Sequence, residues 1–529
     1  MSTPAQAMMP TPTDTVIIAQ LQQQMEAKDQ QLGAKERALE LAELKIQVLE
    51  ERLRQQLIAK YGKRSETLSD LQLELLDLEP GVSSEEIEAE SDREPITAKT
   101  EDKTESKPRR KHPGRQTLPA HLERVEQIVA CTAEQCRCGR CGKETSVIGY
   151  EETEVLDVRP VEYFVTVIQR EKRACRGCEE QGVQTAAVPE RIVAKSLLSD
   201  QVIIDLVVRK YCEAMPLYRQ QAMLRRDAGL EIGLSTLDDA VMRVGDLLIP
   251  IAMAMKRELL AGTYIQADET PVGVQTHDKR GSNHQAYFWQ YGSPGKGVVF
   301  DFQMGRGSDG PKLFPGPFQG LLQTDGYAGY NKVVSGRMVH AGCLAHARRK
   351  FVDAVKLNAH DADSASIVGL MDDLFRIDRE AREQNMDHAE RDALRQQRAP
   401  QVLEQMRAQM LVMQKKLLPK SAAGQAANYT LLLWNKLTLF LKYPELELST
   451  HLAENSMRPI AIGRKNWLHL GSKEAGPRIA AIFSVVESCR RVGLPIRKYL
   501  ADVLPGLANR SIQTMAEITP TAYAAKQAK

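Results

Sequence analysis

Thr263-Tyr-Ile-Gln-Ala-Asp268 and Gly320-Leu-Leu-Gln-Thr-Asp325 are the two stretches that decide the fold of this chain. Each is a short apolar run that closes on an aspartate, and each is followed by strand-stopping residues, Thr270-Pro271 in one case and Gly326 in the other. The pattern predicts two buried strands that both end in a carboxylate. One such aspartate commonly caps a turn, but two in matching contexts 57 residues apart (325 − 268) indicate a shared site.

Neighbouring segments extend this unit. The sequence predicts two further strands over residues 284–291 and 297–302, joined by a glycine turn at 292–297, and a helix over residues 343–355. Three strands, a short connection, a fourth strand and a helix are the skeleton of a ribonuclease-H-like α/β domain. In that skeleton the first and fourth strands are neighbours, so Asp268 and Asp325 can share a metal ion.

A third acid, Glu454, lies far along the chain in His451-Leu-Ala-Glu-Asn-Ser-Met-Arg458. It is predicted on a short helix that begins near Thr450 and ends or kinks before Pro459. Three converging carboxylates would bind divalent metal, which is the chemistry of enzymes that cut and join phosphodiester strands. The alternative for Glu454 is a surface pair with Arg458, worth roughly a few tenths of a kcal/mol.

The 129 positions from Asp325 to Glu454 (454 − 325) leave room for an inserted helical region. Apolar residues follow helical spacing there: Ile367, Leu370, Met371, Leu374 and Ile377, and then Leu403, Met406, Met410 and Met413. Such an insertion can carry DNA contacts or hold subunits together, and the sequence leaves both open.

Length and composition set the frame. The chain has 529 residues, enough for three or more domains, and its hydrophobic fraction of 43% suits a folded protein. No apolar stretch approaches the ~18 residues of a membrane span, and residues 1–15 lack the pattern of a secretory signal. We therefore expect a cytoplasmic protein without a membrane partner. The net charge of +2 decides nothing by itself.

Two CxxC pairs stand out among the nine cysteines. They are Cys138-Gly-Arg-Cys141 and Cys175-Arg-Gly-Cys178, with 33 residues between them (175 − 141 − 1). Four thiolates in two such pairs predict a closed structural zinc site, and a β-rich run over residues 163–168 could form a hairpin that joins the pairs. Cys131 and Cys136 lie close to the first pair, so a different set of cysteines near Cys138 could supply the ligands. Reduced thiols without metal are the alternative.

An amphipathic helix is predicted near the start of the chain. Apolar residues recur there at intervals of seven, at Ile18, Met25, Leu32, Leu39, Ile46 and Leu53. The companion seam is only half apolar, with Leu21, Lys28, Lys35, Ala42, Leu49 and Gln56. We expect a coiled-coil oligomerisation helix. The alternative is one long helix laid against the body of the same chain.

A charge boundary follows this helix. Residues 79–106 hold ten acidic against three basic residues and almost no large apolar side chain, which indicates a disordered linker. The basic stretch Lys107-Pro-Arg-Arg-Lys-His-Pro-Gly-Arg115 comes next. Such an arm can lie along DNA phosphates, and a solvated loop is the alternative. The candidate phosphate contacts are Arg109, Arg110, Lys111 and Arg115.

Residues 217–226 and 234–243 form two helical patterns separated by Gly229 and Gly233, with Ser235 or Thr236 as the predicted cap of the second helix. The arrangement is compatible with helix-turn-helix DNA recognition. An ordinary helical hairpin gives the same pattern.

Several linked motifs resemble one family. They are Gln266-Ala-Asp-Glu-Thr-Pro271, Thr324-Asp-Gly-Tyr-Ala-Gly-Tyr330, Cys343-Leu-Ala-His-Ala-Arg-Arg-Lys-Phe351, and Ala453-Glu-Asn-Ser-Met-Arg-Pro459 with Gly463-Arg-Lys-Asn-Trp467. The chain resembles the DDE transposases of insertion-sequence family sixty-six over nearly its whole length. The resemblance implies that Asp268, Asp325 and Glu454 are an acidic triad. The polar second seam of the helix and the extra thiol of Cys136 depart from the family pattern.

The resemblance also implies a mechanism. Three carboxylates would hold two Mg²⁺ (or Mn²⁺) ions about 3.5 to 4 Å apart. Water as nucleophile would free a 3′-OH at the element end, and that 3′-OH would then attack target DNA. Candidates for binding DNA phosphates are His346, Arg348, Arg349, Arg458 and Lys465, each with a surface charge or a structural pair as the alternative.

The implied partners are DNA ends and target DNA, a second copy of the chain, and accessory proteins encoded by the element, in the cytoplasm and nucleoid of a bacterium. Two rival functions stay open, a zinc-containing DNA-binding regulator without catalysis and a ribonuclease-H-like nuclease. The predicted multidomain α+β organisation is a coiled coil (15–78), a linker (79–118), a zinc module (119–192), a helical DNA-binding segment (193–258), the catalytic core (259–354 and 446–495) with its helical insertion (355–445), and a C-terminal segment (496–529).

Overall fold

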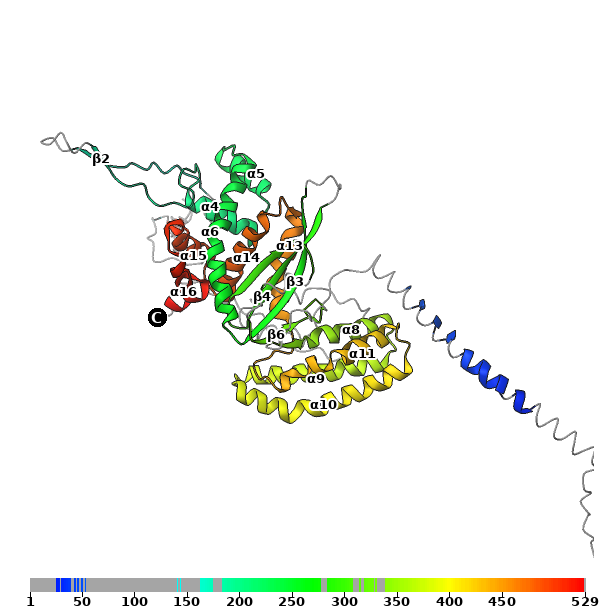
Figure 1. Ribbon diagram of the computed structural model, residues 1–529. Coiled ribbons are helices and arrows are strands. Elements are labelled where there is room, and N and C mark those ends of the chain that lie inside the picture. The colour runs from blue at the N-terminus through cyan, green and yellow to red at the C-terminus, as the bar shows by residue number, and fades with distance from the viewer. Residues whose placement is uncertain are drawn as a thin grey trace, which may run out of the picture.

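The computed structural model describes most of the chain from residue 162 onward (Figure 1). The described residues are 25–28, 30–39, 42–43, 45–46, 49–50, 53, 140, 143, 162–174, 183–276, 283–307, 314, 318–327, 329–330 and 338–527. No helix within these ranges is long and apolar enough to cross a membrane. The described part is a mixed α/β structure.

A mixed sheet lies at the centre. Its strands run in the order β5-β4-β3-β6-β7, and β8 pairs with β3 beyond the end of β6. The pairs β3–β4 and β4–β5 are antiparallel, whereas β3, β6 and β7 run parallel. The predicted neighbourhood of the first and fourth strands is therefore confirmed. The strands are β3 Tyr264–Val274, β4 His284–Gly292, β5 Val298–Gln303, β6 Gly320–Thr324, β7 Met338–Gly342 and β8 His469–Leu470.

The prediction that the first strand stops at Thr270-Pro271 is wrong, because β3 continues to Val274. Pro271 stays in register with Tyr287 of β4, and its carbonyl accepts a hydrogen bond from Arg464 of α13 (His451–Trp467). The N–H and C=O of a strand residue point to the same side, so the N–H that Pro271 lacks faces away from β4 and no ladder bond is lost. Asp268 consequently lies inside the strand and not at its end.

One face of the sheet packs against long helices in a large hydrophobic core. Strand β5 is covered by α14, whose Ser488 and Ser484 hydroxyls accept the N–H groups of Val298 and Phe300 at 2.8 Å. The helices of this part are α4 Asp200–Tyr211, α5 Leu217–Ala228, α6 Leu234–Leu260, α13, α14 Ala475–Arg491, α15 Ile496–Val503 and α16 Pro520–Gln527, with 3-10 turns η3 Leu507–Asn509 and η4 Ile512–Ile518.

The predicted helical hairpin is present as α5 and α6. Helix α5 ends at Gly229, which is left-handed with φ 65°, as expected for a glycine C-cap. Helix α6 begins at Leu234 with Gly233 as its N-cap. The prediction of Ser235 or Thr236 as the cap is therefore wrong. Gly233 has an extended backbone, and the helical conformation begins at the next residue.

The predicted helical region between Asp325 and Glu454 is present. It consists of helices that form a second core with α8 on the other side of the sheet, where Tyr264 of β3 and Leu321 of β6 contribute. In Figure 1 these helices lie together beside the sheet, away from α4, α5 and α6. They are α8 Leu344–Leu357, α9 Ala362–Glu383, α10 His388–Lys416, α11 Ala422–Leu432, α12 Trp434–Leu437 and the 3-10 turn η2 Leu439–Leu441.

The described parts near the start of the chain are helical, and their seam is open to solvent. Met25, Leu32 and Leu39 are 57–65% exposed, so these turns are not laid against the body of the same chain. Further along, residues 163–168 form no strand, contrary to the hairpin we expected there. The antiparallel pair is instead formed by β1 Lys172–Ala174 and β2 Val183–Thr185, because the backbone of Lys172–Ala174 has a partner strand to pair with.

Candidate active site

The three predicted acids come from three elements that meet beside the sheet. Asp268 lies in the middle of β3, Asp325 directly follows β6, and Glu454 lies in the first turn of α13. Strands β3 and β6 are parallel neighbours, and Gln266 is paired with Gln323. Asp268 and Asp325 each lie two residues after this pair, so they are at the same level of the sheet. Helix α13 packs on β3 and β4, which brings Glu454 to the same region.

The electrostatics of Asp268 show that the acids interact. Burial, followed by the charges of Glu454, Glu269 and Asp325, raises the pKa of Asp268 to about 8, and His346 opposes the shift. Like charges around a partly buried carboxyl disfavour its ionised form. A bound cation would remove this repulsion.

Asp325 is held by a tight turn. Its Oδ1 accepts the N–H of Tyr327 at 2.8 Å, and its backbone carbonyl accepts the hydroxyl of Tyr429 from α11 at 2.7 Å. Gly326 has φ 92°, and a Cβ there would lie 2.7 Å from that hydroxyl, so the turn requires glycine. The insertion thus contacts the site directly.

Glu454 faces a histidine from α8. His346 Nε2 lies 3.4 Å from Glu454 Oε1. Burial works against the charged imidazole, but Cys343 and then Glu454 and Asp325 raise the pKa of His346 to about 10. His346 of α8 and Glu454 of α13 are therefore an electrostatic pair between these two helices.

The turn that carries Glu454 is braced from α14. Arg491 Nη2 donates to the carbonyl of Leu452 at 2.9 Å and to the hydroxyl of Ser456 at 2.8 Å, and Arg491 Nε donates to Glu487 at 3.0 Å. Helix α13 then runs through Pro459 to Trp467. The predicted end before Pro459 is wrong, because buried residues on both sides of the proline keep the helix packed.

The donor chemistry of the site fits a hard divalent cation. Asp268, Asp325 and Glu454 supply carboxylate oxygens, the ligands that Mg²⁺ takes in proteins. Among the described residues, no three His, Cys, Asp or Glu side chains form a cluster close enough to hold a metal ion. The acids of this site therefore share an electrostatic environment without preformed ligand geometry.

The phosphate-binding candidates divide into groups. Arg348 is 7% exposed and pairs with Asp372 of α9 through two bonds of 2.6 and 3.0 Å. This geometry favours the structural pair that was its alternative, and it removes Arg348 from the DNA candidates. Arg349 and Lys465 are exposed, and Arg458 is half-buried. His346 lies beside Glu454.

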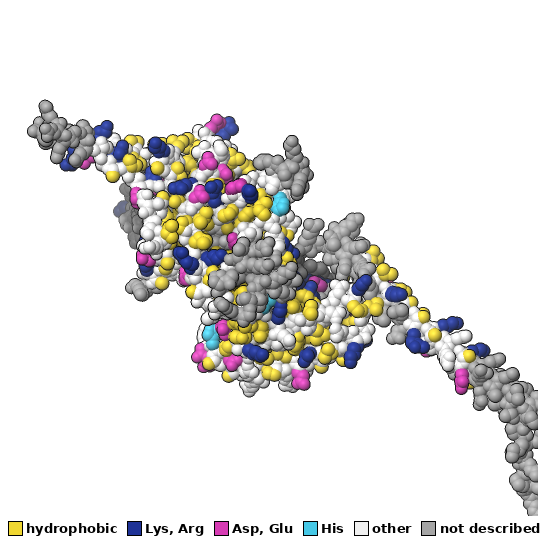
Figure 2. Space-filling model, viewed as in Figure 1, with side chains coloured by type: hydrophobic (Ala, Val, Ile, Leu, Met, Phe, Trp, Pro, Cys, Tyr) yellow, Lys and Arg dark blue, Asp and Glu magenta, His cyan; other side chains and the backbone are white. Residues whose placement is uncertain are grey.

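On the face shown in Figure 2, the charges of the described residues do not mark one path for DNA. Lys and Arg side chains occur there on both the sheet part and the insertion, mixed with Asp and Glu. The basic-arm candidates Arg109, Arg110, Lys111 and Arg115 and the zinc candidates Cys138, Cys141, Cys175 and Cys178 lie outside the described residues and stay predictions.

Sequence reasoning missed a second acid in β3. The Glu269 side chain is 2% exposed, and it binds Arg306 Nη2 at 2.8 Å and the hydroxyl of Tyr330 at 3.1 Å. Burial raises the pKa of Glu269, and Arg306 opposes that shift. The acidic pair Asp268-Glu269 was the available signal, and because consecutive strand residues point to opposite faces, Glu269 is expected on the other face of β3.

Comparison with known proteins identifies the class and then the family. A family model described as "Transposase IS66 family" matches residues 195–478, and one described as "zinc-finger binding domain of transposase IS66" matches residues 135–179. A third, "Transposase C of IS166 homeodomain", matches residues 48–126. These matches define a transposase with a zinc-binding domain. The chain belongs to the IS66 transposase family, which confirms the resemblance seen in the sequence.

Relatives in Sinorhizobium fredii (strain NBRC 101917 / NGR234) match over most of their length. The chain is 29% identical to uncharacterized protein y4qI over 465 residues, 85% of this chain and 84% of the relative. It is 30% identical to uncharacterized protein y4jD over 409 residues, 74% and 78% of the two chains. Against uncharacterized protein y4hP the identity is 27% over 504 residues, 90% and 88%.

Proposed function

We propose that this protein is a DDE transposase that cleaves the ends of its insertion sequence and transfers the freed 3′-OH into target DNA. The observation that carries the proposal is the packing of α13 on β3, beside the parallel neighbour β6, in a chain of a transposase family; the raised pKa of Asp268 supports it. The fold supports it, since two parallel neighbouring strands and a later helix supply the acids, as in a ribonuclease-H-like core.

Each acid has a role in this proposal. Asp268, Asp325 and Glu454 would hold two Mg²⁺ or Mn²⁺ ions, which when bound supply activation of the attacking oxygen and stabilisation of the leaving oxygen. His346 Nε2, which lies 3.4 Å from Glu454 Oε1, would help to hold the carboxylate of Glu454 in place. Arg349, Arg458 and Lys465 would contact DNA phosphates and orient the scissile group.

The other parts of the chain would bind and assemble. A structural Zn²⁺ held by Cys138, Cys141, Cys175 and Cys178 would fold the zinc module, and the basic arm with the α5–α6 hairpin would contact DNA. The heptad seam would join copies of the chain, and accessory proteins of the element would take part. We also propose the domain boundaries predicted from the sequence as the working division, in a cytoplasmic, nucleoid-associated protein.

One assay tests the proposed chemistry. Purified protein with labelled element-end DNA and Mg²⁺ or Mn²⁺ should yield metal-dependent cleavage and joining, with element-encoded accessory proteins added in a parallel arm. Asp268→Asn, Asp325→Asn and Glu454→Gln should each lower the rate by roughly 10³-fold, which corresponds to a loss of about 4 kcal/mol in transition-state stabilisation. DNA binding should stay intact.

The outcomes separate the rival functions. Full activity in one variant would remove that residue from the triad. Cleavage without any joined product would point to a nuclease of the same fold. DNA binding without metal-dependent chemistry in either arm would point to a regulator.

A further inference from the structure

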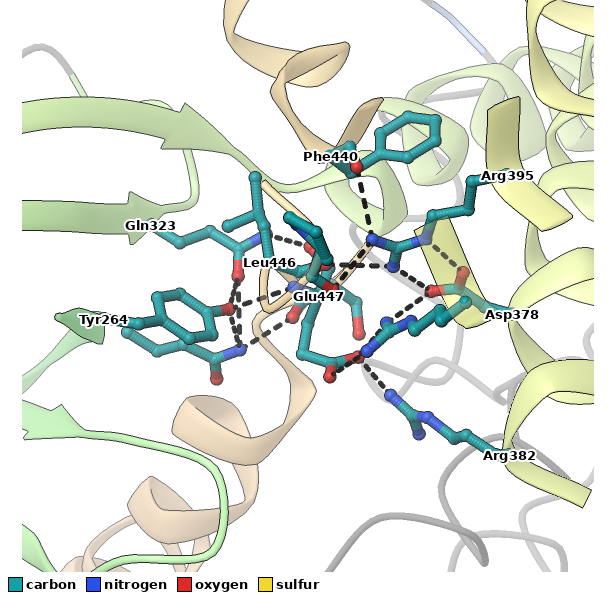
Figure 3. A network of polar contacts seen from close by, with 12 residues as sticks. Tyr264, Gln323, Asp378, Arg382, Arg395, Phe440, Leu446 and Glu447 are labelled. Carbon is teal, nitrogen blue, oxygen red and sulfur yellow. Dashed lines mark hydrogen bonds and ion pairs between the residues drawn. The ribbon is translucent and has the colours of Figure 1, made fainter. Parts of the chain in front are cut away.

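A buried group of charges lies between the helical insertion and the sheet (Figure 3). Asp378 of α9 and Arg395 of α10 are each 1% exposed, and they pair through two bonds of 2.7 Å. Arg391 Nη2 bridges Asp378 Oδ2 at 2.8 Å and Glu447 Oε2 at 3.0 Å. Arg382 completes the group by pairing with Glu447. We call these five residues the arginine network.

The arginine network also holds a stretch of backbone. The Arg395 guanidinium donates to the carbonyls of Phe440 at 3.2 Å, Pro444 at 3.3 Å and Leu446 at 2.9 Å. Buried ion pairs are weak sources of net stability, because desolvation offsets their attraction. Three bonds to one connecting segment therefore point to a role in placing that segment.

The same segment is bound from its other side by the sheet. Gln323 Nε2 of β6 donates to the carbonyl of Glu447 at 2.7 Å, and Gln266 Nε2 of β3 donates to the carbonyl of Ser449 at 3.0 Å. The Tyr264 hydroxyl accepts the N–H of Glu447 at 3.3 Å. Figure 3 shows Tyr264 and Gln323 on one side of Glu447, and Arg382 and Arg395 on the other.

The residues that make these contacts are close in the sequence to the three candidate catalytic acids. Gln266 is two residues before Asp268 and shares its face of β3, and Gln323 is two residues before Asp325. The segment leads directly into α13, where the N–H of Glu454 donates to the carbonyl of Thr450 at 3.0 Å. The network and the sheet thus fix the start of α13 relative to both strands.

We propose that the arginine network is a positioning device for Glu454. Arg391 and Arg395 hold residues 444–450 against Gln266 and Gln323, so that the start of α13, which carries Glu454, is fixed relative to β3 and β6 only when α9 and α10 are seated on the sheet. This inference rests on the proposed function of the three acids. It makes the insertion part of the catalytic assembly, although no residue of the network touches the reacting groups.

Cleavage of the protein backbone by bound iron tests the geometry without DNA. Fe²⁺ replaces Mg²⁺ in carboxylate sites, and with ascorbate and peroxide it cuts the chain near its ligands. The full-length protein should be cut near Asp268, Asp325 and Glu454, and excess Mg²⁺ should suppress all three cuts. Fragments are mapped by mass spectrometry.

The informative variant replaces a buried pair by apolar residues. Asp378→Leu with Arg395→Met removes the bonds to residues 440–446, while apolar replacement of a buried pair can keep a protein folded. The cut near Glu454 should weaken by about 10- to 100-fold, the usual effect of removing a group that orients a metal ligand. The cuts near Asp268 and Asp325 should persist. Should this variant not fold, Glu447→Gln carries the same test.

A matched pair on the same two helices serves as the control. Arg398 of α10 and Glu380 of α9 form an ion pair that is 41% and 37% exposed. Glu380→Leu with Arg398→Met should leave all three cuts unchanged. Equal cutting near Glu454 in the network variant and in this control would overturn the inference.

Failure of the inference and failure of the proposed function look different. If the unaltered protein is cut at none of the three acids, the metal site itself is wrong, and the inference falls with it. If the unaltered protein is cut at all three and the network variant keeps all three, only the inference falls. Where DNA cleavage is measured in parallel, the network variant should lose about 10²-fold in rate at saturating DNA, the effect of a misplacement of about 1 Å.

Discussion

Asp268 and Asp378 are both aspartates inside the fold, but their surroundings shift their pKa values in opposite directions. For Asp268, burial and the nearby charges of Glu454, Glu269 and Asp325 raise the pKa to about 8. For Asp378, burial acts in the same sense, but Arg395 and Arg391 overcome it and hold the pKa well below its usual range. In one chain, the surroundings therefore favour the neutral form of Asp268 and the ionised form of Asp378.

The difference is where the balancing positive charge comes from. The arginine network contains its own cations, so it is complete within the chain. Glu454, Glu269 and Asp325 all raise the pKa of Asp268, and His346 is the cation that opposes this shift. A group that is disfavoured in the folded chain alone is a candidate for binding something from outside, which is why we place the metal there and a positioning role in the network.

The largest effect should come from breaking the arginine network at one partner. Arg395→Met leaves Asp378 buried with the single bond from Arg391, and removing one member of a buried pair costs roughly 3 to 5 kcal/mol of unfolding free energy. Urea unfolding at neutral pH measures this. Arg398→Met, on the same helix in an exposed pair, should cost less than about 0.5 kcal/mol. Equal losses in the two variants would show that burial does not distinguish these pairs.

An intermediate effect should appear in acid, where Glu447 of the network loses its negative charge. Burial alone would raise the pKa of Glu447, but Arg382 and Arg391 hold it at about 2. A carboxyl with a lowered folded-state pKa stabilises the protein above its unfolded-state pKa, and this stability is lost as the pH falls toward the folded value. The stability difference between the unaltered protein and Glu447→Gln should shrink by roughly 2 to 3 kcal/mol between about pH 6 and about pH 2.

Urea midpoints across that pH range measure the difference. A gap between the two proteins that stays constant down to about pH 2 would contradict the lowered pKa of Glu447. For Glu447, the free energy of unfolding rises with pH in this range. For Asp268, whose pKa is raised, the free energy of unfolding should fall with pH at higher pH.

Many of the strands and helices were predictable because their patterns of apolar residues lie within short stretches of sequence. Strands β3 and β6 follow from short apolar runs, and α9 and α10 follow from apolar residues at helical spacing. The misses are positions where tertiary packing overrides a local signal. Pro271 stays in a strand because its free side faces Arg464, and Pro459 stays in a helix because its neighbours are buried. Strand β7 was not predicted at all.

The site was predictable only in part, for the same reason. Asp268 and Asp325 stand in strand contexts that a sequence reveals, whereas Glu454 was assigned through the resemblance to a family. The arginine network gave no local signal. Asp378 and Glu447 are 69 positions apart (447 − 378), and in a helix each charged residue of the network resembles a solvated surface residue until the fold buries it.

The smallest effect should come from removing the charge at the candidate active site, and its sign is opposite to that in the network. A folded-state pKa of about 8 for Asp268 lies above the unfolded value, so the folded protein binds a proton that the unfolded chain has released. Stability of the metal-free protein therefore falls as the pH rises from about 4 to about 8. Asp268→Asn does not titrate and escapes this loss.

We expect Asp268→Asn to be more stable than the unaltered protein near pH 8 in chelator, by on the order of 1 kcal/mol, a figure kept small because the side chain is only partly buried and solvent screens it. Near pH 4 the two should match. Thermal unfolding followed by circular dichroism measures the difference. Added Mg²⁺ should raise the melting temperature of the unaltered protein at the higher pH and leave Asp268→Asn unchanged, because metal binding requires the ionised carboxylate. If Asp268→Asn is the less stable protein in chelator near pH 8, the carboxyl is being stabilised within the chain, and the contrast with Asp378 does not hold.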